Sequence, residues 1–223
     1  MIGLLGGTFD PVHFGHLRPA LEVSQALELA DLWLIPLRQA VHRPQPQASP
    51  EQRLAMLRLA VGEETGIRID DRELRRAGQS YTYDTLAEIR AELGMSRGLC
   101  LLVGADAFRG FLTWHRPDDI LDLVHLVVMQ RPALPGEGGQ DTNAGLNQEF
   151  SAELQTWLQP RRCRDVRELT TSPAGRVWFQ GVTQLDISST RIRGLIVSGL
   201  SPRFLLPDPV WAYIQARRLY QRP

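Results

Sequence analysis

The sequence contains no lysine, so all 25 of its basic residues are arginine. This absence excludes P-loop ATPases, which place a Lys on the β- and γ-phosphates, and enzymes that form a Schiff base through a Lys amine. It also excludes protein kinases, because their Lys–Glu pair cannot be built. Cationic chemistry must therefore come from Arg, His, a metal ion or backbone N–H groups.

Several other features are also scarce. The 25 basic residues are balanced by 25 acidic ones, so the net charge gives no sign of nucleic acid or an anionic membrane as a partner. No apolar run approaches the roughly 18 residues that span a bilayer. The first residues lack the charged region of a signal peptide. Cys100 and Cys163 form no CxxC motif and are expected to be reduced. We therefore expect a cytoplasmic protein that binds neither membrane nor nucleic acid.

The length of 223 residues suits a single domain covering the whole chain, 1–223. Short apolar runs, typical of buried parallel strands, alternate with stretches of helical spacing. We expect strands at Ile2–Leu5, Leu32–Leu37, Ile67–Asp70, Leu99–Val103, Val124–Met129 and Val177–Phe179. This alternation predicts an α/β fold of Rossmann-like type, with a doubly wound, mostly parallel sheet and helices on both faces. Ligands of such sheets bind at the carboxyl ends of the strands.

Helices are expected over Gly15–Ala30, from a capping box at Ser49–Gln52 and up to Gly94. Residues 132–175 are predicted to be a variable insertion with a loop and a helix. Residues 187–223 are predicted to form a C-terminal helical part, whose last helix has Asp208 as its N-cap. Arginines outside the motifs are interpreted as solvated surface: Arg72, Arg75, Arg76, Arg161, Arg162 and Arg164.

The first motif that indicates chemistry lies where the first strand meets the first helix. It reads Gly6-Gly7-Thr8-Phe9-Asp10-Pro11-Val12-His13-Phe14-Gly15-His16. The glycines let the backbone approach a ligand, and a helix N-terminus offers N–H groups to an anion. Two histidines three residues apart share one face of a helical turn. A zinc site usually needs a third protein ligand, so the pair suits an anion better, and we expect no metal ligands from the chain.

The second motif, Ile187-Ser188-Ser189-Thr190-Arg191-Ile192-Arg193, is a hydroxyl-rich helix start followed by two arginines. Its hydroxyl, N–H and guanidinium groups could hold phosphate oxygens. Taken alone, the motif fits an ordinary N-cap with two solvated arginines better. Its occurrence together with the first motif favours the phosphate site.

The two motifs resemble the HxGH and ISSTxIR signatures of the nucleotidyltransferase superfamily. The resemblance implies that His13 and His16 contact the ATP phosphates and stabilise the transition state at the α-phosphorus, with Arg193 also acting on phosphates. It implies further ATP contacts from both motifs, by Gly6, Gly7, Thr8, Phe9, Ile187, Ser188, Ser189 and Thr190.

Three segments between the motifs, Gln79–Leu86, Gly104–Phe108 and Thr113–Arg116, and the tail from Gly199 to Tyr220 carry a second resemblance. They are similar to bacterial nicotinate-nucleotide adenylyltransferases, and the similarity runs from residue 2 to about 220 outside the insertion. By this resemblance Trp114 stacks on the nicotinate ring, and N–H groups near Thr85 and His115 meet its carboxylate, with Thr82 in the same site. Without its flanking motif, Trp114 would be interpreted as a core aromatic. Gly104 and Asp106 would face the nucleotide, where Asp106 either accepts a ribose hydroxyl or organises Mg²⁺.

One departure from the family pattern precedes Arg43. Relatives often have two prolines before a His and a Lys or Arg, whereas this chain has Ala40-Val41 before His42-Arg43. Arg43 is therefore a triphosphate ligand or a solvated loop residue with about equal weight.

The combined prediction is adenylyl transfer from ATP, with Mg²⁺, to nicotinate mononucleotide, giving deamido-NAD and pyrophosphate. Three alternatives stay open: nicotinamide mononucleotide as acceptor, phosphopantetheine as acceptor, or a nucleotide-binding sensor without catalysis. The sequence is compatible with a monomer and with a homo-oligomer.

Overall fold

The structure is a computed structural model that describes residues 1–39, 45–130 and 150–221. Its sheet has six strands in the order β3-β2-β1-β4-β5-β6, and all neighbours run parallel. The strands are β1 (Ile2–Gly7), β2 (Asp31–Pro36), β3 (Ile67–Ile69), β4 (Leu99–Gly104), β5 (His125–Gln130) and β6 (Val177–Gly181). Each lies where an apolar run predicts a strand, so the Rossmann-like, doubly wound sheet is confirmed.

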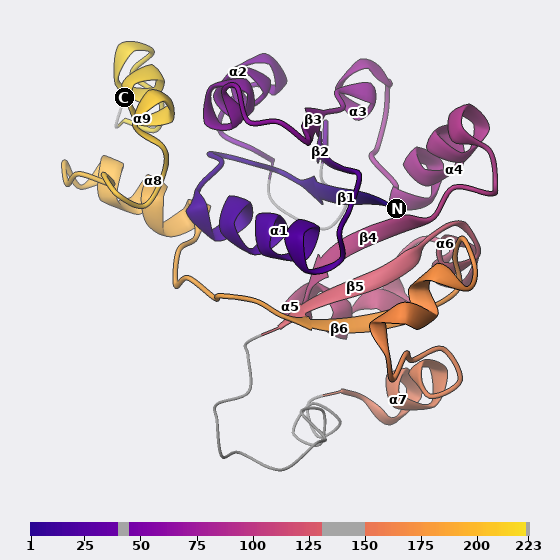
Figure 1. Ribbon diagram of the computed structural model, residues 1–223. Coiled ribbons are helices and arrows are strands. Elements are labelled where there is room, and N and C mark those ends of the chain that lie inside the picture. Colours follow the sequence, from indigo (N-terminus) through magenta and orange to yellow (C-terminus); the bar gives the residue numbers. More distant parts are fainter. Residues whose placement is uncertain (40–44, 131–149, 222–223) are drawn as a thin grey trace.

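Helices cover both faces of the sheet (Figure 1). They are α1 (Phe14–Ala26), α2 (Pro50–Val61), α3 (Arg72–Arg75), α4 (Thr82–Leu93), α5 (Ala105–Arg109), α6 (Pro117–Leu123), α7 (Ala152–Leu158), α8 (Ser189–Val197) and α9 (Asp208–Ala216), with short 3₁₀ turns η1 (Phe111–Thr113) and η3 (Val166–Thr170). None of the helices in the described ranges is long and apolar enough to cross a membrane.

The core consists of two buried clusters, one on each face of the sheet. Because side chains alternate along a strand, Leu4 enters one cluster and Leu5 the other. The cluster of Leu5 includes apolar residues of α1, α2, α8 and α9, whereas that of Leu4 includes residues of α4, α5, α6 and α7. The C-terminal helices thus pack on the same face as α1, the helix that follows the first motif.

Three local expectations are wrong. The first strand does not end at Leu5, because Gly6 and Gly7 continue its register against Ile35 and Pro36 of β2. The first helix ends at Ala26, because Glu28 adopts a left-handed φ of 47° and turns the chain toward β2. Asp208 is the first residue of α9 and Pro207 is the N-cap, so the carboxylate lies in the first turn near the positive end of the helix dipole.

The interpretation of Arg72 as solvated surface is also wrong. Its guanidinium is buried and donates to Asp70 Oδ2 at 2.7 Å and to Glu92 Oε1 at 3.0 Å. Arg75 is exposed, as expected, with 72% of its side chain accessible. Buried between two carboxylates, the Arg72 cation ties the end of β3 to α4.

Candidate active site

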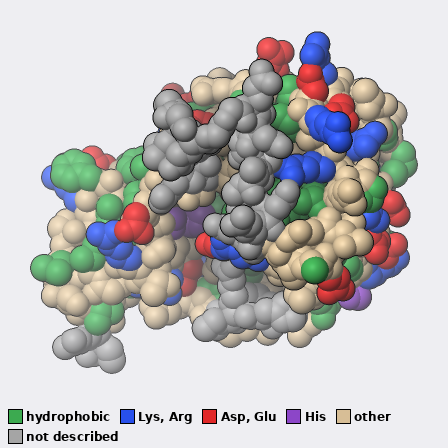
Figure 2. Space-filling view, turned by 90° about the horizontal axis from the view of Figure 1, so that it is seen from below, with side chains coloured by type: hydrophobic (Ala, Val, Ile, Leu, Met, Phe, Trp, Pro, Cys, Tyr) green, Lys and Arg blue, Asp and Glu red, His purple; other side chains and the backbone are tan. Residues whose placement is uncertain are grey.

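The site begins at the point where the strand order of the sheet reverses. From β1 the chain builds β2 and β3 on one side, and then β4, β5 and β6 on the other. The connections that leave β1 and β4 therefore diverge, and such a switch point is where parallel sheets bind ligands. The first motif leaves β1 at this edge, and Gly104 ends β4 beside it. Figure 2 shows histidine surface near the middle of one face of the molecule, with acidic and basic side chains around it.

The loop between β1 and α1 is compact and largely buried. Phe9 adopts a left-handed φ of 50° with its ring in the core. A Cβ on Gly7 would lie 2.9 Å from that ring, so this position requires glycine. The ring of Phe9 contacts His16 edge-on, with 5.2 Å between centroids. Phe9 thus acts as a packing support under the histidines.

His13 and His16 form a stacked pair at the start of α1. Their ring centroids are 3.7 Å apart and the ring planes are inclined by 27°. His13 is the N-cap of the helix, and no side chain caps that end. The Nδ1 atoms of both rings are buried without a hydrogen-bond partner in the structure. Buried polar atoms are rarely left unpaired, but these two have almost no accessible surface, so contact with a ligand falls to the exposed part of the rings.

Burial keeps both imidazoles neutral. It lowers the pKa of His16 to about 4 and that of His13 to about 2, and the charge of a protonated His16 lowers the pKa of His13 further. Two stacked rings cannot both carry a proton unless a negative charge offsets them. A polyanion placed against the pair would supply that charge and raise both pKa values. The geometry is therefore suited to an anionic ligand.

The second motif is attached directly to the first. Ser189 Oγ donates to the Pro11 carbonyl at 2.9 Å, and Arg193 Nη1 donates to the Asp10 carbonyl at 2.6 Å. A Cβ on Gly15 would lie 2.9 Å from the Ile187 carbonyl oxygen, so the two backbones nearly touch. The motifs, about 175 residues apart in sequence, thus share one site, as the resemblance implies.

The hydroxyls of the second motif have three separate partners. Ser188 caps α8, since its Oγ accepts from the Arg191 backbone N–H at 3.2 Å. The Ser189 hydroxyl bonds to the first motif, as described above. Thr190 Oγ1 accepts from Arg193 Nη2 at 3.3 Å. The N-cap reading therefore holds for Ser188, while Arg193 is drawn toward the first motif and 22% of its side chain is exposed.

Two further residues, Asp10 and Arg53, support the site, although no sequence pattern singles out either one. The carboxylate of Asp10 is buried and accepts from the backbone N–H groups of Gln47 and Ala48 and from the hydroxyl of Tyr220. The guanidinium of Arg53 is fully buried and donates to the carbonyls of Thr8 and Leu37 at 2.7 and 2.8 Å. Asp10 lies inside the first motif, but its acceptor role depends on residues far along the chain.

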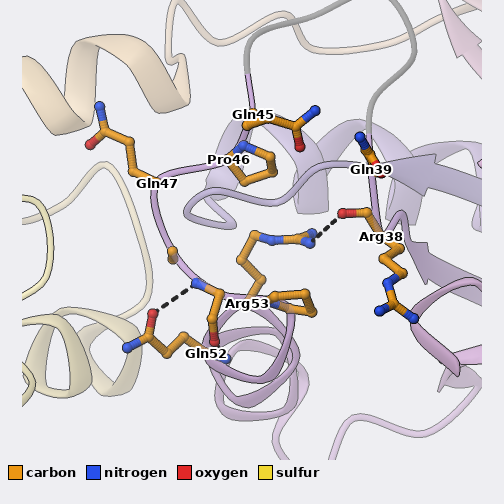
Figure 3. Close-up of a pocket in the computed structure, with 10 residues that line it drawn as sticks. Arg38, Gln39, Gln45, Pro46, Gln47, Gln52 and Arg53 are labelled. Atoms are coloured by element: carbon orange, nitrogen blue, oxygen red, sulfur yellow. Dashed lines mark hydrogen bonds between the residues drawn. The ribbon is translucent and has the colours of Figure 1, made fainter. Parts of the chain in front are cut away.

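A polar pocket of about 400 Å³ lies beside the loop that follows β2 (Figure 3). Arg53 lies across its base and donates to the Arg38 carbonyl at 3.2 Å. Burial lowers the pKa of Arg53, and the nearby Asp10 carboxylate opposes this shift. The wall of the pocket is formed by Arg38, Gln39, Gln45, Pro46, Gln47, Ala48, Ser49, Pro50 and Gln52. Arg43 lies outside the described residues.

Trp114 and His115, which are predicted to bind the mononucleotide, follow β4, across the switch point from the first motif. Trp114 is partly buried and packs on Phe111, with 5.4 Å between ring centroids. His115 is exposed, and its ring lies 4.6 Å from that of Tyr81, the N-cap of α4. Thr82 is the first residue of that helix. The structure therefore brings His115 to the α4 N-terminus, close to both predicted threonines.

The side chain of Thr85 is already engaged within the protein. Its hydroxyl donates to Glu73 Oε1 at 2.7 Å and accepts from Arg76 Nη2 at 2.8 Å. Burial raises the pKa of the Glu73 carboxyl, while the bond from Thr85 opposes this shift. Any ligand contact near Thr85 thus falls to the backbone of the helix start. Asp106, in the first turn of α5, is exposed and pairs with Arg109.

Comparisons with known proteins agree with this geometry. A family model described as cytidylyltransferase-like matches residues 4–195. A probable nicotinate-nucleotide adenylyltransferase of Hahella chejuensis is 47% identical over 98% of this chain and 95% of its own length. A protein of the same description from Methylococcus capsulatus is 44% identical over the full length of both. The chain belongs to the nicotinate-nucleotide adenylyltransferase family.

Solved structures show the same fold. Nicotinic acid mononucleotide adenylyltransferase of Plasmodium falciparum, complexed with NaAD, superimposes with a TM-score of 0.71 over 98% of this chain and 96% of that chain. The two sequences are only 14% identical, so this likeness concerns the architecture. The resemblance to this family seen in the sequence is confirmed.

Proposed function

We propose that this protein transfers the adenylyl group of ATP to nicotinate mononucleotide, giving deamido-NAD and pyrophosphate. The observation that carries the proposal is the stacked pair of His13 and His16 at the sheet's switch point, on the same loop whose Asp10 carbonyl accepts from Arg193. The names of the close relatives support the same reaction. We further propose that residues 187–223 are the phosphate-binding C-terminal part of a single domain.

The reaction needs positioning and charge stabilisation more than covalent chemistry. A phosphate oxygen of the mononucleotide attacks the α-phosphorus of ATP in line and forms a new P–O bond. The bond between the α-phosphorus and the oxygen that bridges to the β-phosphate breaks. Pyrophosphate leaves with the electron pair of the broken bond. The attacking phosphate is already an anion, so no enzyme nucleophile is required. His13, His16 and Arg193 donate to phosphate oxygens as charge builds in the transition state.

The remaining ATP contacts are proposed from the two motifs and the adjacent strand end. Backbone groups of Gly6, Gly7, Thr8 and Phe9 border the phosphates. The start of α8 in the second motif borders the phosphates from the opposite side, through Ile187, Ser188, Ser189 and Thr190. Gly104 and Asp106, at the end of β4, are proposed to face the nucleotide. Arg43 remains a proposed triphosphate ligand.

Selectivity for nicotinate is proposed to arise beyond β4. A flat ring stacked on Trp114 would have its carboxylate near the α4 N-terminus, beside Thr82, Thr85 and His115. Backbone N–H groups donate to a carboxylate but meet only one acceptor on an amide, so they favour nicotinate over nicotinamide.

Magnesium is proposed to arrive with ATP. Within the described residues, no group of three or more His, Cys, Asp or Glu side chains could hold a metal ion. These residues build no all-protein metal site, and Mg²⁺ commonly binds substrate phosphates with one or two carboxylates at most. We propose the cytoplasm as the place of action, because both cysteines are free thiols.

The test is pyrophosphate release from ATP with nicotinate mononucleotide, run beside nicotinamide mononucleotide and phosphopantetheine. We expect the first acceptor to give by far the highest kcat/KM. Preference for another acceptor would assign the protein to that reaction. ATP binding by calorimetry without pyrophosphate release on any acceptor would indicate a sensor and overturn the proposal.

A further inference from the structure

We propose that Tyr220 is a positioning residue for adenylyl transfer: its hydroxyl fixes the Asp10 carboxylate so that Arg193 stays available to substrate phosphates. This inference rests on the proposed function, because it takes Arg193 to act on ATP. It concerns a residue 210 positions away from the motif it touches.

The Asp10 carboxylate is nearly saturated with donors. Oδ1 accepts from Tyr220 at 2.7 Å and from the Ala48 N–H at 3.1 Å, and Oδ2 accepts from the Gln47 N–H at 2.8 Å. Only 3% of Asp10 is exposed, so water cannot readily replace a missing donor. The three donors come from two separate segments, which fixes the carboxylate plane from both sides.

Arg193 forms a long ion pair with this carboxylate but no hydrogen bond to it. Its Nη1 donates to the backbone carbonyl of Asp10 at 2.6 Å and lies 3.8 Å from Oδ2. The longer distance is beyond a hydrogen bond. A carboxylate released on one side could rotate toward the guanidinium and form a direct, charge-assisted pair with it. Such a hydrogen-bonded pair would hold the guanidinium more tightly and draw it away from the substrate phosphates.

Tyr220 is suited to prevent that rotation. Its ring is buried in the cluster shared with α8 and α9, which restrains the hydroxyl. Burial and the adjacent Asp10 raise the pKa of the phenol, so the hydroxyl stays a donor throughout the working range of pH. The ring alone would preserve the packing, and therefore Tyr220→Phe removes the hydrogen bond while leaving the apolar contacts.

The first experiment measures kcat and KM of Tyr220→Phe for ATP and nicotinate mononucleotide. Loss of one positioning bond should lower kcat by about tenfold, with each KM changed by less than about threefold. Ile214→Val is the matched control, because it loosens the packing of buried α9 without touching Asp10. Tyr213→Phe removes a hydroxyl from the same helix. Both controls should keep wild-type kcat at a temperature where all variants are folded.

A double-mutant cycle tests whether the effect passes through Arg193. In the background of Arg193→Lys, which cannot form the same fork, Tyr220→Phe should cost less than about twofold in kcat. A full tenfold cost in both backgrounds would overturn the proposed route. So would an unchanged kcat in Tyr220→Phe, or an equal loss in Ile214→Val. Wild-type protein that releases no pyrophosphate would instead contradict the proposed function itself.

Discussion

The rings of His13 and His16 stack face to face, 3.7 Å apart, at the N-terminus of α1. Each ring keeps a buried Nδ1 atom without a partner. Each of the two neutral imidazoles can still accept a proton. An anion bound against the rings would favour their protonated form, so substrate binding and charge stabilisation draw on the same pair of residues.

His16→Ala should abolish most of the activity while leaving the fold intact. Removal of one transition-state donor typically costs about a hundredfold or more in kcat. Half-buried His16 contacts Phe9 and His13, so the free energy of unfolding should fall by only about 1 kcal/mol. Pyrophosphate release and urea unfolding on the same preparation check both parts. Turnover close to wild type would remove His16 from the mechanism.

The pair should also make the empty enzyme sensitive to acid. Its pKa values, about 2 and about 4, lie below the value of 6.5 for an unperturbed histidine. The unfolded chain therefore takes up protons first. The stability contribution is complete above pH 6.5 and is lost as pH falls toward the folded values, by about 1.4 kcal/mol per pH unit and imidazole.

Urea unfolding at pH 7 and pH 5.5 measures this loss. His13→Gln combined with His16→Gln should flatten the dependence, and ATP should reduce it in the wild type because the triphosphate favours protonated rings. An equally steep dependence in the double variant would show that other groups cause it.

Gly15→Ala should reduce turnover by separating the two motifs. The new Cβ would lie 2.9 Å from the Ile187 carbonyl and 3.0 Å from the His13 ring, so one of these must shift. A shift of a few tenths of an ångström in the reacting geometry should cost roughly tenfold in kcat. Gly194→Ala in α8 is the matched control, because its Cβ would meet nothing within 4 Å.

The control should gain about 0.5–1 kcal/mol of stability, as alanine does in a helix, and keep its turnover. Thermal unfolding and initial rates of both variants decide the matter. Equal kcat in the two variants would mean that the close approach at Gly15 is not needed for catalysis.

Trp114→Ala should impair binding of the acceptor and leave ATP binding intact. Loss of a stacked aromatic typically costs about 1–3 kcal/mol, which corresponds to a KM for nicotinate mononucleotide raised by roughly 5- to 150-fold. Trp114→Phe should recover part of this, since a flat ring remains. Initial rates at varied acceptor and saturating ATP provide the measurement. A rise in the KM of ATP alone would show that Trp114 contacts ATP and not the mononucleotide.

Most strands were predictable because they are continuous apolar runs, which a parallel sheet buried on both faces requires, whereas β3 was predictable from its alternating Ile67-Arg68-Ile69 pattern. The start of α2 was predictable in detail: Ser49 and Gln52 form the expected capping box in the structure. Strand ends differed where local geometry overrode the pattern, as at Gly6 and Gly7, which stay in the sheet as long as β2 runs beside them.

The buried arginines were not predictable from the sequence. Arg53, Arg72 and Arg90 look like any surface arginine, because the groups that satisfy them are mostly backbone carbonyls or carboxylates brought together by the fold. The bond between Asp10 and Tyr220 was not predictable either, because only the fold brings these two residues together. The two motifs identified the reacting groups, whereas the groups that support them depend on long-range contacts.

Arg90 provides a test of this structural use of arginine, away from the site. Its guanidinium is buried and donates to four carbonyls, those of Leu123, Gly94, Arg97 and Pro173. All four precede the amino ends of strands or follow α4, so they lie at the edge of the sheet opposite the switch point.

Arg90→Met keeps an apolar stem but leaves the carbonyls without donors, and should cost about 3 kcal/mol of unfolding free energy. Arg97→Ala, an exposed neighbour, should cost less than about 0.5 kcal/mol. Urea unfolding compares the two variants, and kcat per folded molecule should equal that of the wild type in both, because neither residue touches the histidine pair or α8. Equal stabilities would show that the carbonyls find water instead, and a lowered kcat in Arg90→Met would show that the two edges of the sheet are coupled.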